Sequence, residues 1–190
     1  TPTAGGSVNG GGTFYEGTSC TLTATPATGY TFTNWTKNGT QVSTNPTYTF
    51  TVNAAGAYTA NFAAIPQYTI TATANPTAGG TVTGGGTFYQ NTSCTLTATA
   101  NTGYAFTNWT KNGSQVSTNP TYTFTVTAAG TYVANFDQLT AHSVTCSEVE
   151  GGVIGASVST AYPGDVVTLT ATASSGDFFS EWDVKDANNN

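Results

Sequence analysis

Few residues in this 190-residue sequence could take part in catalysis. Nucleophilic catalysis needs a base beside the nucleophile, and the only histidine is His142. An aligned segment earlier in the chain has Tyr68 at the same position, so His142 is interpreted as a structural residue at the start of a strand. Paired-carboxylate catalysis has no candidates in residues 1–136, where Glu16 is the single acid. The sequence therefore predicts no enzyme and no cofactor.

Three acidic residues, Glu181, Asp183 and Asp186, form the one weak candidate for a metal site. Their carboxylate oxygens are the hard ligands that calcium prefers. Their spacing has no calcium-loop signature, which favours a solvated acidic strand and turn. We therefore expect no bound metal.

The three cysteines, Cys20, Cys94 and Cys146, fall one in each of three repeated segments, so no segment can close a disulfide of its own. Cys94 shares strand parity with Leu96, and Cys146 shares it with Val144. All three are predicted to be buried thiols that pack as small hydrophobic side chains. These spacings and the single histidine exclude a zinc site.

The feature that must position these residues is an internal repeat. Residues 2–62 recur 74 positions later as residues 76–136, and of the 61 aligned positions 11 differ and 50 are identical. A third, more divergent copy begins near His142 and keeps Gly151-Gly152 and Trp182, with one inserted residue. An active site is normally built once per chain, whereas a spacer or multivalent binder gains from copy number. Repetition therefore favours a structural or binding role.

The repeat phase predicts three domains. Repeat 1, residues 1–64, lacks its first strand; repeat 2, residues 65–138, is complete; repeat 3, residues 139–190, is divergent, acidic and truncated at its C-terminal end. We expect an excerpt from a longer array, and the alternative is that strands from neighbouring copies of the chain complete the end units. Ile65-Pro66 and residues 137–140 are short links, so neighbouring modules are expected to touch.

Charge is sparse and uneven along the chain. Residues 1–136 carry only Glu16, Lys37 and Lys111, whereas residues 137–190 carry eight acids and one lysine, and there is no arginine. This composition excludes the basic surface that nucleic-acid binding requires. No stretch approaches the roughly 18 apolar residues of a membrane span, so no membrane insertion is expected in this segment.

Most of repeat 2 alternates apolar and polar residues with a period of two, as in residues 68–73, 94–99 and 131–136. Asn-Gly pairs at Asn38 and Asn112 stand between extended runs and predict hairpins with positive φ at both turn residues. No segment shows helical periodicity, so the sequence predicts an all-β tandem array of modules of about 74 residues with no significant helix. The predicted structural core consists of Trp35, Trp109, Trp182, Phe32, Phe106, Phe179, Leu22, Leu96 and Leu169.

The order of these motifs resembles a known family, the divergent internalin-B-type B-repeat of Listeria–Bacteroides type bacterial surface proteins. Each tryptophan follows a Gly-aromatic-x-Phe-x-x pattern, except that Asp177 replaces the aromatic residue before Trp182. The resemblance covers nearly the whole chain. It implies small β-grasp-like or sandwich-like modules in extracellular proteins, used as stalks or adhesive segments, and it carries over no catalytic residues. The motifs of repeat 2 that carry it are Tyr-Thr-Ile-Thr-Ala from Tyr68, Gly-Gly-Thr-Val from Gly79, Thr-Leu-Thr-Ala-Thr-Ala from Thr95, Gly-Tyr-Ala-Phe-Thr-Asn-Trp from Gly103, Tyr-Thr-Phe-Thr-Val from Tyr122 and Tyr-Val-Ala-Asn-Phe from Tyr132.

We expect a non-enzymatic structural or adhesive repeat segment, such as a stalk, spacer or filament component, of a secreted or cell-surface bacterial protein. Its expected partners are neighbouring repeats or copies of the same chain. The alternative is a module that binds glycans or a host protein, with repeat 3 as the recognition unit. Aromatic residues such as Phe88 and Tyr89 would contact a glycan if they face outward, but alternation also allows either ring to lie in the core.

Overall fold

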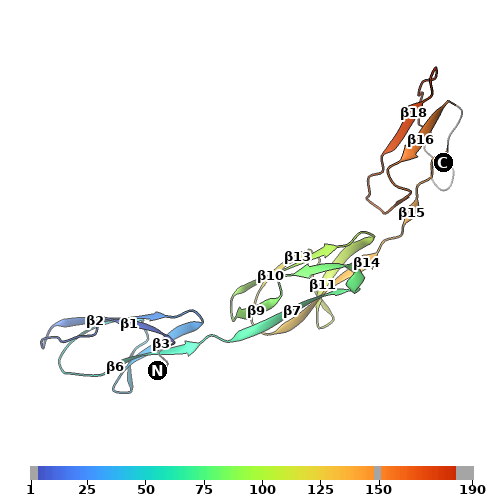
Figure 1. Ribbon diagram of the computed structural model, residues 1–190. Coiled ribbons are helices and arrows are strands. Elements are labelled where there is room, and N and C mark those ends of the chain that lie inside the picture. The colour runs from blue at the N-terminus through green and yellow to red at the C-terminus, as the bar shows by residue number, and fades with distance from the viewer. Residues whose placement is uncertain (1–3, 148–150, 183–190) are drawn as a thin grey trace. The chain divides into compact units, whose positions relative to one another are not determined.

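A computed structural model describes residues 4–147 and 151–182 of the chain. These residues form strands and one 3-10 turn, η1 (Thr77–Gly79), which confirms the all-β prediction (Figure 1). None of the described helical segments is long and apolar enough to cross a membrane. The strands of repeat 1 are β1 (Gly6–Asn9), β2 (Ser19–Pro26), β3 (Tyr30–Lys37), β4 (Thr40–Ser43), β5 (Thr47–Thr51) and β6 (Tyr58–Ala64). Those of repeat 2 are β7 (Gln67–Asn75), β8 (Gly80–Thr83), β9 (Gly86–Tyr89), β10 (Ser93–Ala100), β11 (Tyr104–Lys111), β12 (Ser114–Ser117), β13 (Thr121–Thr125) and β14 (Gly130–Gln138).

Two compact units divide the chain. The first comprises residues 1–72, 84–96 and 121–132, and the second comprises residues 73–83, 97–120 and 133–190. The division passes through β7, β10 and β14, which all belong to repeat 2. The repeat boundaries drawn from the sequence therefore stay predictions.

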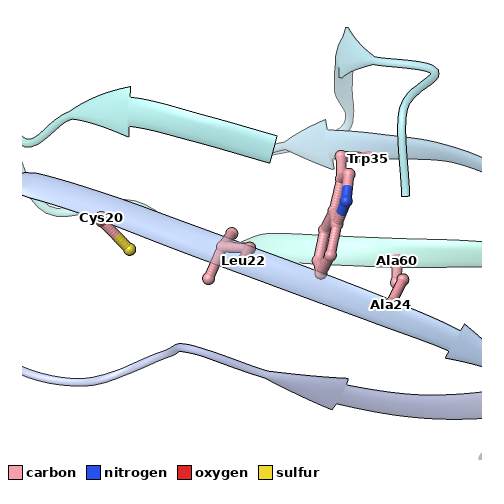
Figure 2. Close-up of a cluster of buried hydrophobic side chains, with 5 residues drawn as sticks. All are labelled: Cys20, Leu22, Ala24, Trp35 and Ala60. Atoms are coloured by element: carbon pink, nitrogen blue, oxygen red, sulfur yellow. The ribbon is translucent and has the colours of Figure 1, made fainter. Parts of the chain in front are cut away.

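Repeat 1 folds into two three-stranded antiparallel sheets, ordered β1-β2-β5 and β4-β3-β6. Alternation along β2 turns Cys20, Leu22 and Ala24 to one face and threonines to the other. That apolar face packs against Trp35 and Ala60 of the second sheet, and these five side chains form the buried core. Figure 2 shows the Trp35 ring reaching toward the strand that carries Leu22. Repeat 1 is thus a small sandwich.

Repeat 2 follows the same plan with two more strands. Its sheets are ordered β13-β10-β8 and β12-β11-β14-β7-β9. Leu96 and Trp109 are buried, as are Leu22 and Trp35 in repeat 1, whereas Phe32 and Phe106 are half-buried at the edge of the core. The additional strand β7 brings Ile70 into the core, where it is 1% exposed.

The Asn-Gly turns have the backbone geometry that the sequence predicts. Asn38 and Gly39 have φ angles of 48° and 85°, and Asn112 and Gly113 have φ angles of 51° and 80°. Two consecutive positive φ angles give a two-residue hairpin the twist of its flanking strands. The turns therefore join β3 to β4 and β11 to β12 as tight antiparallel hairpins.

One backbone carbonyl ties the two sheets of repeat 1 together. The Trp35 indole Nε1 donates a hydrogen bond to the Pro46 carbonyl oxygen at 3.1 Å, and the same oxygen accepts the Ala24 amide at 3.0 Å. Trp35 lies on β3, whereas Ala24 lies in the other sheet, on β2. Repeat 2 has the same pair of bonds to Pro120, from Trp109 at 3.1 Å and from Ala98 at 3.0 Å. The buried indole is thereby satisfied and its ring orientation fixed.

Repeat 3 departs from the predicted core. Its described strands are β15 (His142–Ser143), β16 (Gly152–Ala156), β17 (Thr160–Ala161) and β18 (Leu169–Ala173), which pair as β15-β17 and β16-β18. Phe179 is 49% exposed and Trp182 is 41% exposed, while Leu169 is half-buried, so the prediction that Phe179 and Trp182 are buried is wrong. In repeat 1, by contrast, Trp35 is buried in a cluster with Ala60 of β6, and the half-buried Phe50 of β5 packs against that cluster.

Replacing Trp35 with Phe should test the carbonyl link. Trp35→Phe keeps an aromatic ring but removes the donor to Pro46, so the free energy of unfolding should fall by about 1–3 kcal/mol in urea titrations. The half-exposed Trp182 serves as the control, and Trp182→Phe should change stability by no more than about 0.5 kcal/mol. An equal loss from the two substitutions would contradict this role of Trp35.

Candidate inter-repeat junction

A glycine turn lies at the end of repeat 1 that meets the link to repeat 2. Gly29 has a φ of 82°, which a residue with a Cβ rarely adopts, and the turn closes through the Tyr30 amide donating to the Ala27 carbonyl at 3.0 Å. The outward Gly29 carbonyl accepts the Ile65 amide of the link at 2.8 Å. The link thus begins anchored to the turn.

An aromatic ring covers the same glycine. A Cβ placed on Gly29 would lie 2.6 Å from the Tyr89 hydroxyl oxygen and 2.9 Å from its Cζ atom, so the phenol ring packs directly on the glycine backbone. Tyr89 ends β9, which pairs with β7 through Gln67 opposite Tyr89. The next residue, Gln90, donates its amide to the Pro66 carbonyl at 2.8 Å. Turn, link and ring all lie within the first compact unit.

The second compact unit contains the same arrangement. Gly103 also has a φ of 82°, and its carbonyl accepts the Leu139 amide at 2.8 Å. A Cβ on Gly103 would lie 2.9 Å from Cζ of Tyr162. The Tyr162 amide in turn donates to the Asp165 carboxylate at 2.9 Å. One junction chemistry therefore recurs: a left-handed glycine, a link amide and a tyrosine ring.

Two residues of the same types lack these neighbours. Tyr15, the counterpart of Tyr89, is 88% exposed, and Gly176, with a φ of 99°, has nothing within 4 Å of a Cβ placed on it. The position of the Tyr89 ring against Gly29 is therefore not set by the sequence of its own loop alone.

Sequence reasoning anticipated contact at the short links but missed the residues that make it. Gly29 and Tyr89 stand 60 positions apart, so no local pattern pairs them. The sequence held one sign of this contact: tyrosine recurs at positions 15, 89 and 162, and glycine recurs at positions 29, 103 and 176. Phe88 and Tyr89, considered above as glycan contacts, are both half-buried, and the Tyr89 ring is engaged at the junction.

The cysteines have two different environments. Cys20 and Cys94 are buried, and each thiol lies 3.5 Å from a glycine carbonyl, that of Gly10 and Gly84 respectively. Burial raises the pKa of the Cys94 thiol above its ordinary value. Cys146 is only half-buried, so the buried-thiol prediction does not extend to it.

The described part of the chain offers no candidate metal site. It contains no group of three or more His, Cys, Asp or Glu side chains arranged to hold a metal ion. Glu181 is exposed, whereas Asp183 and Asp186 lie outside the described residues. His142 is an exposed residue of β15, as its interpretation as a strand-start residue requires.

The comparisons with known proteins agree with the repeat pattern. The family model of the divergent InlB B-repeat domain matches residues 1–66, 70–140 and 142–190. No curated protein and no solved structure matches the chain.

A methyl group on Gly29 should displace the Tyr89 ring. In Gly29→Ala the new Cβ overlaps the phenol, so nitration of Tyr89 by tetranitromethane, followed by peptide mapping, should rise toward that of the exposed Tyr15. Gly39→Ala is the matched control, because Gly39 has a similar φ of 85° with nothing within 4 Å of its Cβ position. Unchanged Tyr89 nitration in Gly29→Ala would show that the ring does not rest on this glycine.

Thiol reactivity should separate the cysteines. The thiolate is the nucleophile, so the raised pKa and burial of Cys94 predict that iodoacetamide at neutral pH modifies it much more slowly than Cys146. As the pH rises, the rate at Cys94 should keep increasing beyond the ordinary thiol pKa, because its thiolate fraction is still growing there. In urea the three rates should converge, and a native Cys94 that reacts faster than Cys146 would contradict the assigned environments.

Proposed function

The chain belongs to the divergent InlB B-repeat domain family, and on this basis we propose that it is a non-enzymatic structural or adhesive segment of a secreted or cell-surface protein. The family suggests a bacterial surface repeat domain, and it is not a known enzyme family. In this role the repeats act as spacers whose number sets the reach of the segment.

The recurring junction is the observation that carries the proposal. At both links a backbone amide binds the turn glycine, and a tyrosine ring covers that glycine. A backbone hydrogen bond contributes about 0.5–1.5 kcal/mol, and packing of an aromatic ring adds to it. The same contacts at successive links give each added repeat the same restraint on its neighbour, which is what a spacer requires.

The outer faces of the sheets support a mechanical role. Thr21 and Thr49 share a hydrogen bond between their hydroxyls at 2.9 Å across β2 and β5, and Thr95 and Thr123 share one at 2.8 Å across β10 and β13. Cross-strand pairs of this kind stabilise antiparallel strands. The threonine hydroxyls on these faces therefore stabilise strand pairing without charged side chains.

The half-buried Lys37 lies beside an aromatic ring. Lys37 Nζ lies 5.3 Å from the centre of the Tyr58 ring, an arrangement that attracts the ammonium to the aromatic face. Residues 1–136 contain three charged side chains, so such a surface gives little electrostatic attraction to charged partners. Glycan or host-protein binding by repeat 3 stays the alternative prediction.

Loss of the junction ring should uncouple repeats 1 and 2. In the parent chain, amide 15N relaxation should give both repeats similar rotational correlation times, since the junction restrains them. Tyr89→Ala should shorten both times and make them differ, while Tyr15→Ala, at the exposed counterpart, should leave them unchanged. If the two repeats already tumble independently in the parent chain, the spacer proposal fails.

A further inference from the structure

The longest strands of repeat 2 are its first and its last. Strands β7 (Gln67–Asn75) and β14 (Gly130–Gln138) have 9 residues each, and they are hydrogen-bonded neighbours in the sheet ordered β12-β11-β14-β7-β9. The link from repeat 1 leads into β7, and the link to repeat 3 follows β14. Tension along the chain therefore enters and leaves repeat 2 through two neighbouring strands.

Contacts at the ends of these strands show that they run parallel. Asn75, the last residue of β7, donates from Nδ2 to the Asn135 Oδ1 atom of β14 at 3.3 Å. Just beyond β7, a Cβ placed on Gly79 would lie 2.7 Å from the Cβ atom of Phe136. An antiparallel pair with these contacts would overlap only near the two C-terminal ends, and the start of β7 would lie beyond the end of β14.

The two compact units agree with this direction. The first unit contains residues 67–72 of β7 and residues 130–132 of β14, and the second contains residues 73–75 and 133–138. In an antiparallel pair, the start of one strand would group with the end of the other. The first residue of β7 and the last residue of β14 therefore lie at opposite ends of the pair.

This arrangement decides how the pair responds to a pull. Tension applied at opposite ends of neighbouring parallel strands acts along the strands. The evenly spaced backbone hydrogen bonds of a parallel pair then share the load and must stretch together. Strands pulled apart from the same end lose these bonds one at a time instead. The same set of bonds is therefore much stronger in the first geometry than in the second.

Buried side chains protect the backbone bonds of the pair. On the inner face of the sheet, Ile70 of β7 and Tyr132, Ala134 and Phe136 of β14 are all buried. Hydrogen bonds that are shielded from water are electrostatically stronger, and water does not readily replace a partner that is stretched away.

A row of amide side chains reinforces the outer face. Asn75 of β7 donates to Asn135 of β14, and Asn135 Nδ2 donates to the Asn108 Oδ1 atom of β11 at 2.7 Å. Asn108 Nδ2 then donates to the Gln115 Oε1 atom of β12 at 3.0 Å. The row connects four neighbouring strands, so it distributes a load on β7 across the sheet.

We propose that β7 and β14 form a shear clamp, which makes repeat 2 a load-bearing module that resists tension between its two links. This function goes beyond that of a spacer, because a spacer sets reach and need not resist a pull. The clamp lies within repeat 2 and uses neither Gly29 nor the ring of Tyr89.

Single-molecule force spectroscopy on the full 190-residue chain tests the clamp by changing the direction of pull. DNA handles are attached to azide-bearing residues at exposed positions. Handles at Gln67 and Gln138 load the pair from opposite ends, whereas handles at Gln67 and Ala129 load it from the same end. At one pulling speed, the unfolding force should be at least about twofold higher in the opposite-end geometry. Equal forces in the two geometries would overturn the proposal.

Two substitutions separate the clamp from overall stability. Asn75→Ala removes the side-chain bond between β7 and β14, so unfolding under constant force should be at least about threefold faster in the opposite-end geometry and unchanged in the same-end geometry. Thr95→Ala is the matched control, because it removes a 2.8 Å bond to Thr123 in the other sheet. It should lower the melting temperature without changing either unfolding rate.

Equal acceleration by Asn75→Ala and Thr95→Ala in the opposite-end geometry would overturn the clamp. Because the handles flank repeat 2 alone, this result does not depend on whether repeats 1 and 2 tumble together. Failure of the spacer proposal and failure of the clamp are therefore separate outcomes.

Discussion

The sandwich structure of repeats 1 and 2 depends in each case on one backbone carbonyl oxygen that accepts two hydrogen bonds. The Pro46 oxygen accepts the indole of Trp35 from one sheet and the amide of Ala24 from the other. A buried indole donor without a partner would cost the free energy of its lost hydration, so this bond fixes the largest core side chain in a single orientation. The described residues contain no buried side-chain nitrogen or oxygen atom without a partner. Packing around Trp35 can then be entirely apolar.

The fixed tryptophan organises the core of both repeats. Cys20, Leu22, Ala24 and Ala60 are buried around Trp35 in repeat 1. In repeat 2 the added strands extend a core that already exists. Repeat 3 gives the contrast, because its described residues leave Trp182 partly exposed and form only two-stranded sheets.

The contact at the link between repeats 1 and 2 depends on shape. The junction at Gly29 needs a residue without a side chain, since both its positive φ and the overlying ring exclude a Cβ. This contact does not depend on charge, in keeping with residues 1–136, and it recurs between Gly103 and Tyr162.

The sequence by itself determined the repeat, the all-β class, the Asn-Gly hairpins and the family, because strand alternation and turn chemistry are local properties of the chain. Alternation also shows which residues share a face with Leu22 or Cys20. It could not show that Tyr89 covers Gly29 or that Trp182 is partly exposed. Those facts were decided by tertiary structure, since burial depends on what lies across from a side chain. Residues of the same type at matching positions, such as Tyr15 and Tyr89, therefore have different surroundings.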